Sequence, residues 1–146
     1  ILNLMPDCWY HYEFYYYGDS ADDPNKELIT TIGVKSIVTQ PNDDMEKMPK
    51  GVHMIRGYAW SGAGAISEVD VSVDGGETWY SAHIEEPRER FMWVRWSYRW
   101  DADKPGKYKI MSRATDEVGR VQSREPRYNN MRKNFSAIVG YDIEIK

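Results

Sequence analysis

The sequence predicts an all-β protein folded as a two-layer sandwich. The strongest apolar signals repeat with period two, as in half-buried strands, rather than with the 3.6-residue period of amphipathic helices. Turn signals recur about every 8–12 residues, which is typical of short strands in a sandwich. Aromatic residues favour strands, and they make up 14% of the 146 residues, with 6 Trp and 11 Tyr.

The expected strands follow one another from residue 29 to the end of the chain. They cover Ile29 to Val38, Val52 to Trp60, Ile66 to Val73, a stretch resuming at Trp79, Met92 to Trp100, Tyr108 to Met111 and Val139 to Ile145. Asp74-Gly75-Gly76 predicts a tight hairpin, because glycine tolerates the positive φ angles of such turns. About seven short strands with this spacing indicate an immunoglobulin-like β-sandwich.

The segment from Phe91 to Trp100 has two different faces. One face carries Met92, Val94, Trp96, Tyr98 and Trp100. The other carries Phe91, Trp93, Arg95, Ser97 and Arg99. A mixture of aromatic residues and arginine is typical of contact surfaces, so Trp93, Arg95 and Trp96 are our candidates for a subunit interface. Core packing remains the alternative for Trp60, Trp93 and Trp96, because aromatic side chains are enriched in both places.

The first 32 residues differ from the rest and form an irregular N-terminal extension. Trp9 to Tyr17 is densely aromatic, whereas Gly18 to Lys26 is polar and acidic. An aromatic stretch without matching core partners favours packing against another domain or chain. We therefore divide the chain into an extension, 1–32, and a sandwich domain, 33–146. The chain starts with Ile and lacks a signal-like segment, so we expect a piece of a longer protein.

Charge and composition argue against several partners and sites. With 19 Lys and Arg against 23 Asp and Glu, the net charge is −4, which disfavours nucleic acid as a partner. The mean hydropathy is −0.71 and no window approaches the roughly 20 apolar residues of a membrane span. The single cysteine, Cys8, permits no intrachain disulfide, and the three histidines lack metal-ligand spacing. We name no catalytic residue and no metal ligand.

Arginine is the residue type that offers binding chemistry. Several arginines lie in stretches rich in Trp and Tyr, where a guanidinium group can stack on a ring or clamp an oxyanion. A strand arginine at the surface or an interface ion pair is the alternative for each of them. These residues alone support an interaction surface without specifying its function.

Longer motifs give more information than composition. They are Val34 to Pro41 (VKSIVTQP), Ile55 to Gly64 (IRGYAWSGAG), Ile66 to Trp79 (ISEVDVSVDGGETW), Trp93 to Trp96 (WVRW) and Ser112 to Gln122 (SRATDEVGRVQ). In this order they resemble the C-terminal dimerisation domain of the sulfite oxidase family of molybdopterin enzymes, most closely the sulfane dehydrogenase branch. The resemblance covers residues 33–146, and Leu4 to Asp7 looks like the trailing edge of a preceding molybdenum-cofactor domain.

The resemblance implies an immunoglobulin-like domain that pairs two subunits around a two-fold axis. The parent would be a molybdenum-cofactor-dependent sulfite or sulfane oxidoreductase, and this chain alone would not catalyse. The resemblance also implies that the cofactor is bound by a catalytic domain or subunit outside this chain, that a haem protein accepts the electrons, and that the enzyme is periplasmic. It gives Cys8 no role as a molybdenum ligand.

One substrate-binding residue is implied by the same resemblance. Family members carry a segment like Trp-Asn-x-Arg-Gly before the last strand, and its arginine reaches the pocket for the anionic substrate. Here the segment reads Tyr128-Asn129-Asn130-Met131-Arg132-Lys133, with Tyr in place of Trp, the arginine displaced by one position and no Gly. Arg132 is therefore our substrate-binding candidate and Arg127 the reserve, with a surface or interface cation as the alternative.

Two other functions fit the residues. A free-standing immunoglobulin-like module could bind carbohydrate or protein ligands, with exposed aromatic rings stacking on sugar faces. The chain could also be a separate subunit that pairs with a molybdenum-binding polypeptide.

Overall fold

The computed structural model describes residues 8–41 and 46–146, and the regular secondary structure of these residues is almost entirely β-strand. Its elements are α1 (Trp9–Phe14), β1 (Tyr16–Tyr17), β2 (Glu27–Leu28), β3 (Lys35–Gln40), β4 (Glu46–Met48), β5 (Gly51–Trp60), β6 (Ile66–Ser72), β7 (Tyr80–Ser81), β8 (His83–Ile84), β9 (Val94–Ala102), β10 (Gly106–Asp116) and β11 (Gly140–Ile145). No helix in this part of the chain is long and apolar enough to cross a membrane.

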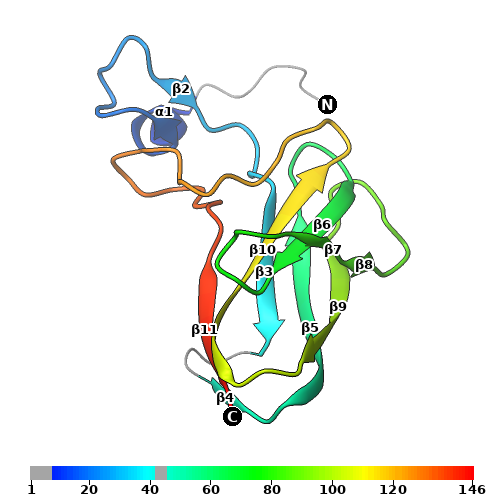
Figure 1. Ribbon diagram of the computed structural model, residues 1–146. Coiled ribbons are helices and arrows are strands. Elements are labelled where there is room, and N and C mark those ends of the chain that lie inside the picture. The colour runs from blue at the N-terminus through cyan, green and yellow to red at the C-terminus, as the bar shows by residue number, and fades with distance from the viewer. Residues whose placement is uncertain (1–7, 42–45) are drawn as a thin grey trace.

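Two sheets lie face to face and form the body of the molecule (Figure 1). One has five strands in the order β4-β11-β10-β6-β7, and the other has four in the order β3-β5-β9-β8. The predicted all-β sandwich is confirmed. The two sheets contain more strands than the seven expected. The extra strands are missed because β4, β7 and β8 have only two or three residues each, too few for a period-two pattern to be recognised in the sequence.

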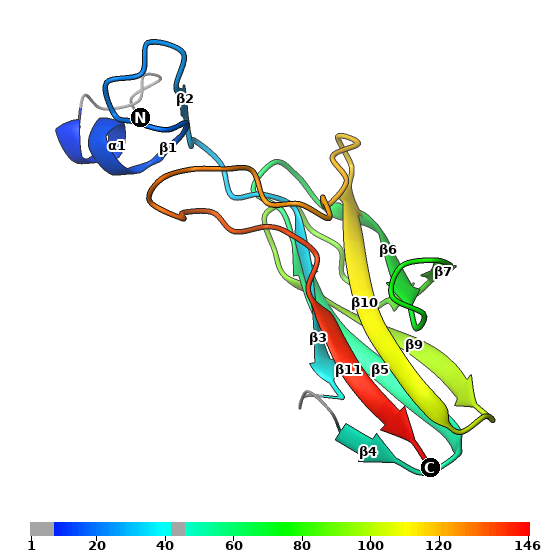
Figure 2. The same ribbon diagram turned by 60° about the vertical axis from the view of Figure 1, so that its left-hand side comes forward.

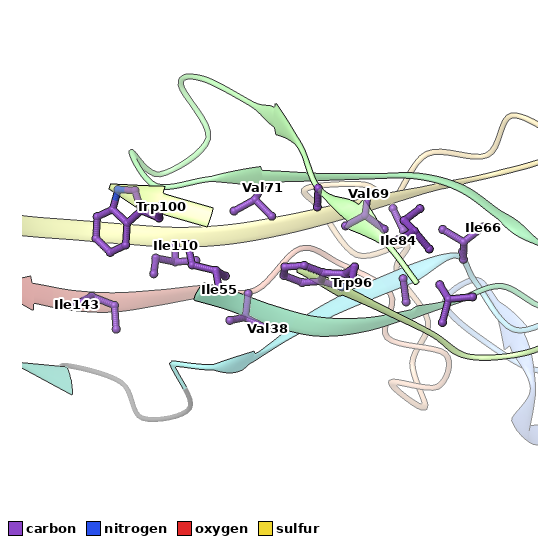
Figure 3. Close-up of a cluster of buried hydrophobic side chains, with 14 of the residues drawn as sticks. Val38, Ile55, Ile66, Val69, Val71, Ile84, Trp96, Trp100, Ile110 and Ile143 are labelled. Atoms are coloured by element: carbon purple, nitrogen blue, oxygen red, sulfur yellow. The ribbon is translucent and has the colours of Figure 1, made fainter. Parts of the chain in front are cut away.

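The core lies between the sheets and is built by the alternating residues of the long strands (Figure 3). Ile55, Ile110 and Trp96 are 0%, 0% and 1% exposed. The indole of Trp96 lies against the backbone of β5 at Gly57, where a Cβ atom would come within 2.3 Å of the ring atom Cζ2. Our assignment of Trp96 to a subunit interface is therefore wrong, because its side chain fills the core instead of facing outward.

The predicted hairpin around Asp74-Gly75-Gly76 joins β6 to β7 through a longer loop than a tight turn. Gly75 and Gly76 have φ angles of 77° and 95°, as the sequence suggested. The carboxylate of Asp74 accepts the backbone amide of Thr78 at 2.9 Å, and the hydroxyl of Ser72 accepts the amide of Gly76 at 2.8 Å. The hydrogen bonds from Thr78 and from the Ser72 hydroxyl hold the pKa of Asp74 far below its usual value.

The extension lies at one end of the sandwich, away from the C-terminus (Figure 2). It consists of α1 and the small β1-β2 hairpin, and the long loop between β10 and β11 turns back toward it. Residues Gly18 and Asn129 form an isolated bridge between this loop and the extension. The two segments, far apart in sequence, therefore meet at the same end of the molecule.

Candidate functional site

The outer side of the four-stranded sheet carries a cluster of aromatic rings. Alternation along β5 and β9 points one set of side chains away from the core. These side chains, with Trp93, form what we call the aromatic face: Val52, Met54, Arg56, Tyr58, Trp60, Trp93, Arg95, Ser97, Arg99 and Asp101. The rings of Trp60 and Trp93 stack with centroids 4.1 Å apart, and Tyr58 meets Trp93 edge-on at 6.2 Å. Although stacked, Trp93 remains 59% exposed.

Three arginines share the aromatic face with these rings, and their charges are only partly neutralised. The Nε atom of Arg95 lies 3.0 Å from a carboxylate oxygen of Glu85. Arg56 donates instead to the neutral side-chain oxygen of Gln40, at 2.9 Å. Arg99 forms no ion pair with any residue that the structure describes. Of the predicted interface residues, Trp93 and Arg95 thus lie together on this face, while Trp96 lies beneath it.

The outer side of the five-stranded sheet, which we call the paired face, has the opposite character. Its cations face carboxylates: Lys109 with Asp142 at 3.0 Å, Arg113 with Asp70 at 2.9 Å and Lys47 with Glu144 at 3.8 Å. Trp79 is covered by the guanidinium group of Arg113, which lies 4.4 Å from the ring centroid. These three cations are therefore paired within the domain, whereas the exposed Lys107 of β10 forms no ion pair with the described residues.

A second candidate site lies in the loop between β10 and β11, where a pocket of about 380 Å³ is found. Its lining residues are Pro126, Arg127, Tyr128, Asn129, Asn130, Arg132, Lys133 and Phe135. Arg132 is exposed and adopts a left-handed backbone conformation, with φ of 51°. Its guanidinium group has no carboxylate partner within residues 8–41 and 46–146. Arg132 is thus free to receive an external anion.

Arg127, the reserve candidate, already has a carboxylate partner. Its guanidinium group makes two hydrogen bonds to the carboxylate of Glu27, at 3.1 and 2.7 Å, and lies 3.8 Å from the ring centroid of Tyr17. The hydrogen bond from Arg127 lowers the pKa of Glu27, and the same contact raises the pKa of Arg127. The geometry therefore separates the two arginines: Arg127 joins the loop to the extension, and Arg132 is available to a ligand.

Asparagine side chains, which our sequence reasoning missed, fix this loop. The amide nitrogen of Asn134 donates to the hydroxyl of Tyr17 at 2.9 Å and to the carbonyl of Thr31 at 3.1 Å. Its oxygen accepts the backbone amide of Gly33 at 3.0 Å. Asn134 has a φ of 53°, and asparagine tolerates this left-handed conformation better than most residues. The loop is therefore fastened to the segment that links extension and sandwich.

The same linking segment is held from the sandwich side by a buried ionic network. The side chain of Asp116 is 0% exposed, and its oxygen accepts from Arg120 Nε at 2.9 Å and from the hydroxyl of Ser61 at 2.8 Å. Arg120 also reaches the carbonyl of Ile32 at 3.4 Å. Burial raises the pKa of Asp116, but the hydrogen bonds from Arg120 and Ser61 outweigh it, so that the pKa is lowered overall.

Among the described residues, the metal-binding side chains do not suit a molybdenum centre. Molybdopterin enzymes of the resembled family bind the metal through a thiolate, and the sole cysteine, Cys8, is exposed. No group of three or more His, Cys, Asp or Glu side chains gathers to hold a metal within the part of the chain that the structure describes. The expected trailing edge at Leu4 to Asp7 lies outside the described residues.

The chain matches the family model of the Mo-co oxidoreductase dimerisation domain over residues 26–140. It is 37% identical over 112 residues to mitochondrial sulfite oxidase of Rattus norvegicus, which covers 71% of this chain and 20% of that protein. It is 29% identical over 141 residues to nitrate reductase [NADH] 1 of Phaseolus vulgaris, covering 86% of this chain and 14% of that protein. The chain thus spans about a fifth or less of these relatives.

A solved structure agrees with the sequence relatives. The sulfane dehydrogenase SoxCD from Paracoccus pantotrophus superimposes with a TM-score of 0.74 at 31% identity, covering 88% of this chain and 34% of that chain. The resemblance to the sulfite oxidase family is therefore confirmed, and the free-standing binding module is disfavoured. This chain belongs to the Mo-co oxidoreductase dimerisation domain family.

Proposed function

We propose that this domain joins two copies of a molybdenum-cofactor oxidoreductase through the aromatic face. The observation that carries this proposal is the stack of Trp60 on the exposed Trp93, on a face where Arg56 and Arg99 lack carboxylate partners among the described residues. Tryptophan, tyrosine and arginine dominate the binding energy of protein interfaces, particularly at the centre of the buried patch. Among the residues that the structure describes, the paired face offers no comparable cluster of stacked aromatic rings.

The composition of the aromatic face also suits contact with a copy of itself. In a two-fold contact the same patch lies on both sides, so the patch must be self-complementary. Arg99 and Asp101 both point outward from β9 and supply opposite charges at one end of the face. Val52 and Met54, opposite them on β5, are 52% and 38% exposed and add apolar area. Two copies can therefore bury apolar surface while their unpaired charges meet.

The extension contacts the catalytic part of the parent enzyme in this proposal. Residues 1–32 are the trailing edge of the molybdenum-cofactor domain, and residues 33–146 form the dimerisation domain. Trp9 and Tyr10 on α1 are 71% and 50% exposed, which suits packing against the rest of that domain. The cofactor is held there, or by a separate catalytic subunit, and the domain described here supplies no metal ligand.

Arg132 provides one cation to the substrate pocket of the parent enzyme. A free guanidinium group offers a fixed fork of donors, which suits the oxygens of an anionic sulfur substrate. Its loop is fastened to the extension through Asn134 and Arg127, so it faces the side on which the catalytic domain lies. When bound, the molybdenum cofactor supplies the two-electron oxidation of sulfite or a sulfane. A haem protein accepts the electrons, and the enzyme works in the periplasm.

The molecular mass and molybdenum content of the native particle test this proposal. We expect a particle much larger than two 17.1 kDa chains, with about one molybdenum per protomer. A metal-free monomer would contradict both the pairing and the link to a catalytic domain.

The role of Arg132 is tested in that native enzyme by steady-state kinetics with sulfite. Arg132→Met is expected to raise KM about tenfold or more with little change in Tm, because a charge-assisted contact to the anion is lost. Lys107→Met is the matched control, since it also removes one exposed cation but at the far end of β10. Equal KM values for the two variants would show that Arg132 is a surface cation without a role in substrate binding.

A further inference from the structure

Asn129 closes the turn that carries Arg132. Its side chain is buried, at 5% exposure, although it lies in a surface loop. The Nδ2 atom donates to the carbonyl of Lys133 at 2.7 Å, and the Oδ1 atom accepts the backbone amide of Lys133 at 2.6 Å. The amide of Arg132 donates to the carbonyl of Asn129 at 3.1 Å. Three hydrogen bonds thus connect Asn129 to the two residues at the end of the turn.

The backbone of Arg132 needs such a constraint. Its φ of 51° lies in the left-handed region, which costs free energy for a residue with a Cβ atom. Conformations of this kind persist where the surrounding contacts over-determine them. Asn129 holds both backbone groups of the next residue, Lys133, and therefore fixes the direction in which the side chain of Arg132 leaves the turn.

Arg132 also depends on the turn because nothing else holds it. Among the three cations that line the pocket, Arg127 is paired with Glu27, and the Nζ atom of Lys133 lies 5.2 Å from the ring centroid of Tyr15. The guanidinium group of Arg132 forms no hydrogen bond or ion pair with the residues described. Its position is consequently set by the backbone and not by an ion-pair partner.

We propose that Asn129 is a positioning residue for the oxyanion site, acting through the backbone of Arg132. This inference rests on the proposed role of Arg132 in binding an anionic sulfur substrate. Without the carboxamide, the turn loses two of its closing hydrogen bonds and Arg132 can relax to a right-handed conformation. The N–H donors of the Arg132 guanidinium group would then have to be reoriented each time an anion binds. This lowers the affinity of a site that depends on fixed geometry.

The test uses the native enzyme with sulfite as the varied substrate and sulfate as a competing anion. Asn129→Ala is expected to raise KM for sulfite about tenfold, close to the effect of Arg132→Met, with a smaller change in kcat. The dissociation constant for sulfate, measured by calorimetry on the resting enzyme, rises by the same factor. The double variant shows no further rise, because both changes remove the same contact. Asn25→Ala, at an exposed asparagine of the extension, is the matched control.

The possible outcomes distinguish a failure of this inference from a failure of the proposed role of Arg132. If Arg132→Met raises KM and Asn129→Ala does not, or if the two effects add, Asn129 has no positioning role. If Arg132→Met leaves KM and the sulfate affinity unchanged, the proposed role of Arg132 itself fails. Should Asn129→Ala not fold, Asn129→Ser keeps one neutral hydrogen-bonding group. An unchanged KM in that folded variant would overturn the inference.

Discussion

The two outer faces of the sandwich are built by the same alternation but differ in how their charges are satisfied. On the paired face, lysine and arginine lie within 2.9 to 3.8 Å of carboxylates, and Trp79 is covered by Arg113. On the aromatic face, the half-buried Trp60 stacks on the exposed Trp93, and Arg56 and Arg99 lack carboxylate partners among the described residues. The paired face thus matches most of its cations within the chain, whereas the aromatic face does not.

This difference shows what strand periodicity can and cannot predict. Period two predicts which residues share a face. It places Trp93, which directly precedes β9, and Trp96, which lies within β9, on opposite faces of the sheet. It does not predict whether a cation on that face meets a carboxylate on the neighbouring strand, since that depends on register. Because the register pairs Lys109 with Asp142 but Arg99 with Met54, the charge of Lys109 is neutralised within the chain and the charge of Arg99 is not.

The largest expected effect separates the two sides of the four-stranded sheet. Trp96→Ala should lower the free energy of unfolding by about 3–5 kcal/mol, because it empties a fully buried core site. Trp93→Ala should cost less than about 1 kcal/mol, since the ring is mostly exposed. Urea denaturation at low protein concentration, where association contributes little, measures both. Equal losses would mean that Trp93 also supports the fold.

The next effect contrasts a buried ion pair with an exposed one. Asp116→Asn should destabilise the domain by about 2 kcal/mol at neutral pH, because the fully buried carboxylate loses its charged hydrogen bond to Arg120, although the Arg120 side chain is 36% exposed and solvent weakens the pair. Asp142→Asn, on the paired face, should cost no more than about 1 kcal/mol. A similar loss for the two variants would show that the Asp116 network is no stronger than a surface pair.

The pH dependence of stability follows from the same carboxylate. Its pKa in the folded state is lowered, so Asp116 contributes stability above the unfolded pKa of about 3.9, and this contribution is lost as pH falls through the folded pKa. Thermal melts between pH 7 and pH 2 should therefore show a shallower acid-side decline for Asp116→Asn than for the unchanged chain. Parallel curves would assign the decline to other groups, such as Asp74 and Glu27, whose pKa values are also lowered.

Self-association tests the comparison of the two faces directly. Trp93→Ala with Arg95→Glu should raise the dimer dissociation constant about 30-fold or more, equivalent to about 2 kcal/mol, in sedimentation equilibrium. Lys109→Glu is the matched control, because it also reverses a cation that lies 3.0 Å from a carboxylate, but on the paired face. If the control weakens the dimer as much, or if neither change does, the aromatic face is not the interface.

The sequence predicted the sandwich and the loop of Arg132 but not the contacts that hold that loop. The side chain of Asn134 donates to Tyr17, and the side chain of Asn129 closes the turn that carries Arg132. No local sequence pattern predicts that these two side chains make such contacts. The ion pair of Asp116 with Arg120 depends on Ser61, which comes from a distant turn. Such contacts arise from tertiary packing. Trp96 was misassigned for a different reason: its residue type suits an interface, although its place in the alternation already indicated the core.

The smallest effect concerns the paired face alone. Lys109→Met should lower the free energy of unfolding by about 0.5 kcal/mol at low salt, because the pair with Asp142 is half-exposed and solvent weakens it. At about 1 M salt, where the screening length is about 3 Å, the difference from the unchanged chain should vanish. Arg99→Met, which removes a cation without a carboxylate partner, should cost nothing at either salt concentration in the monomer. A salt-dependent loss for Arg99→Met would mean that the aromatic face is neutralised within one chain, and the contrast on which the interface rests would disappear.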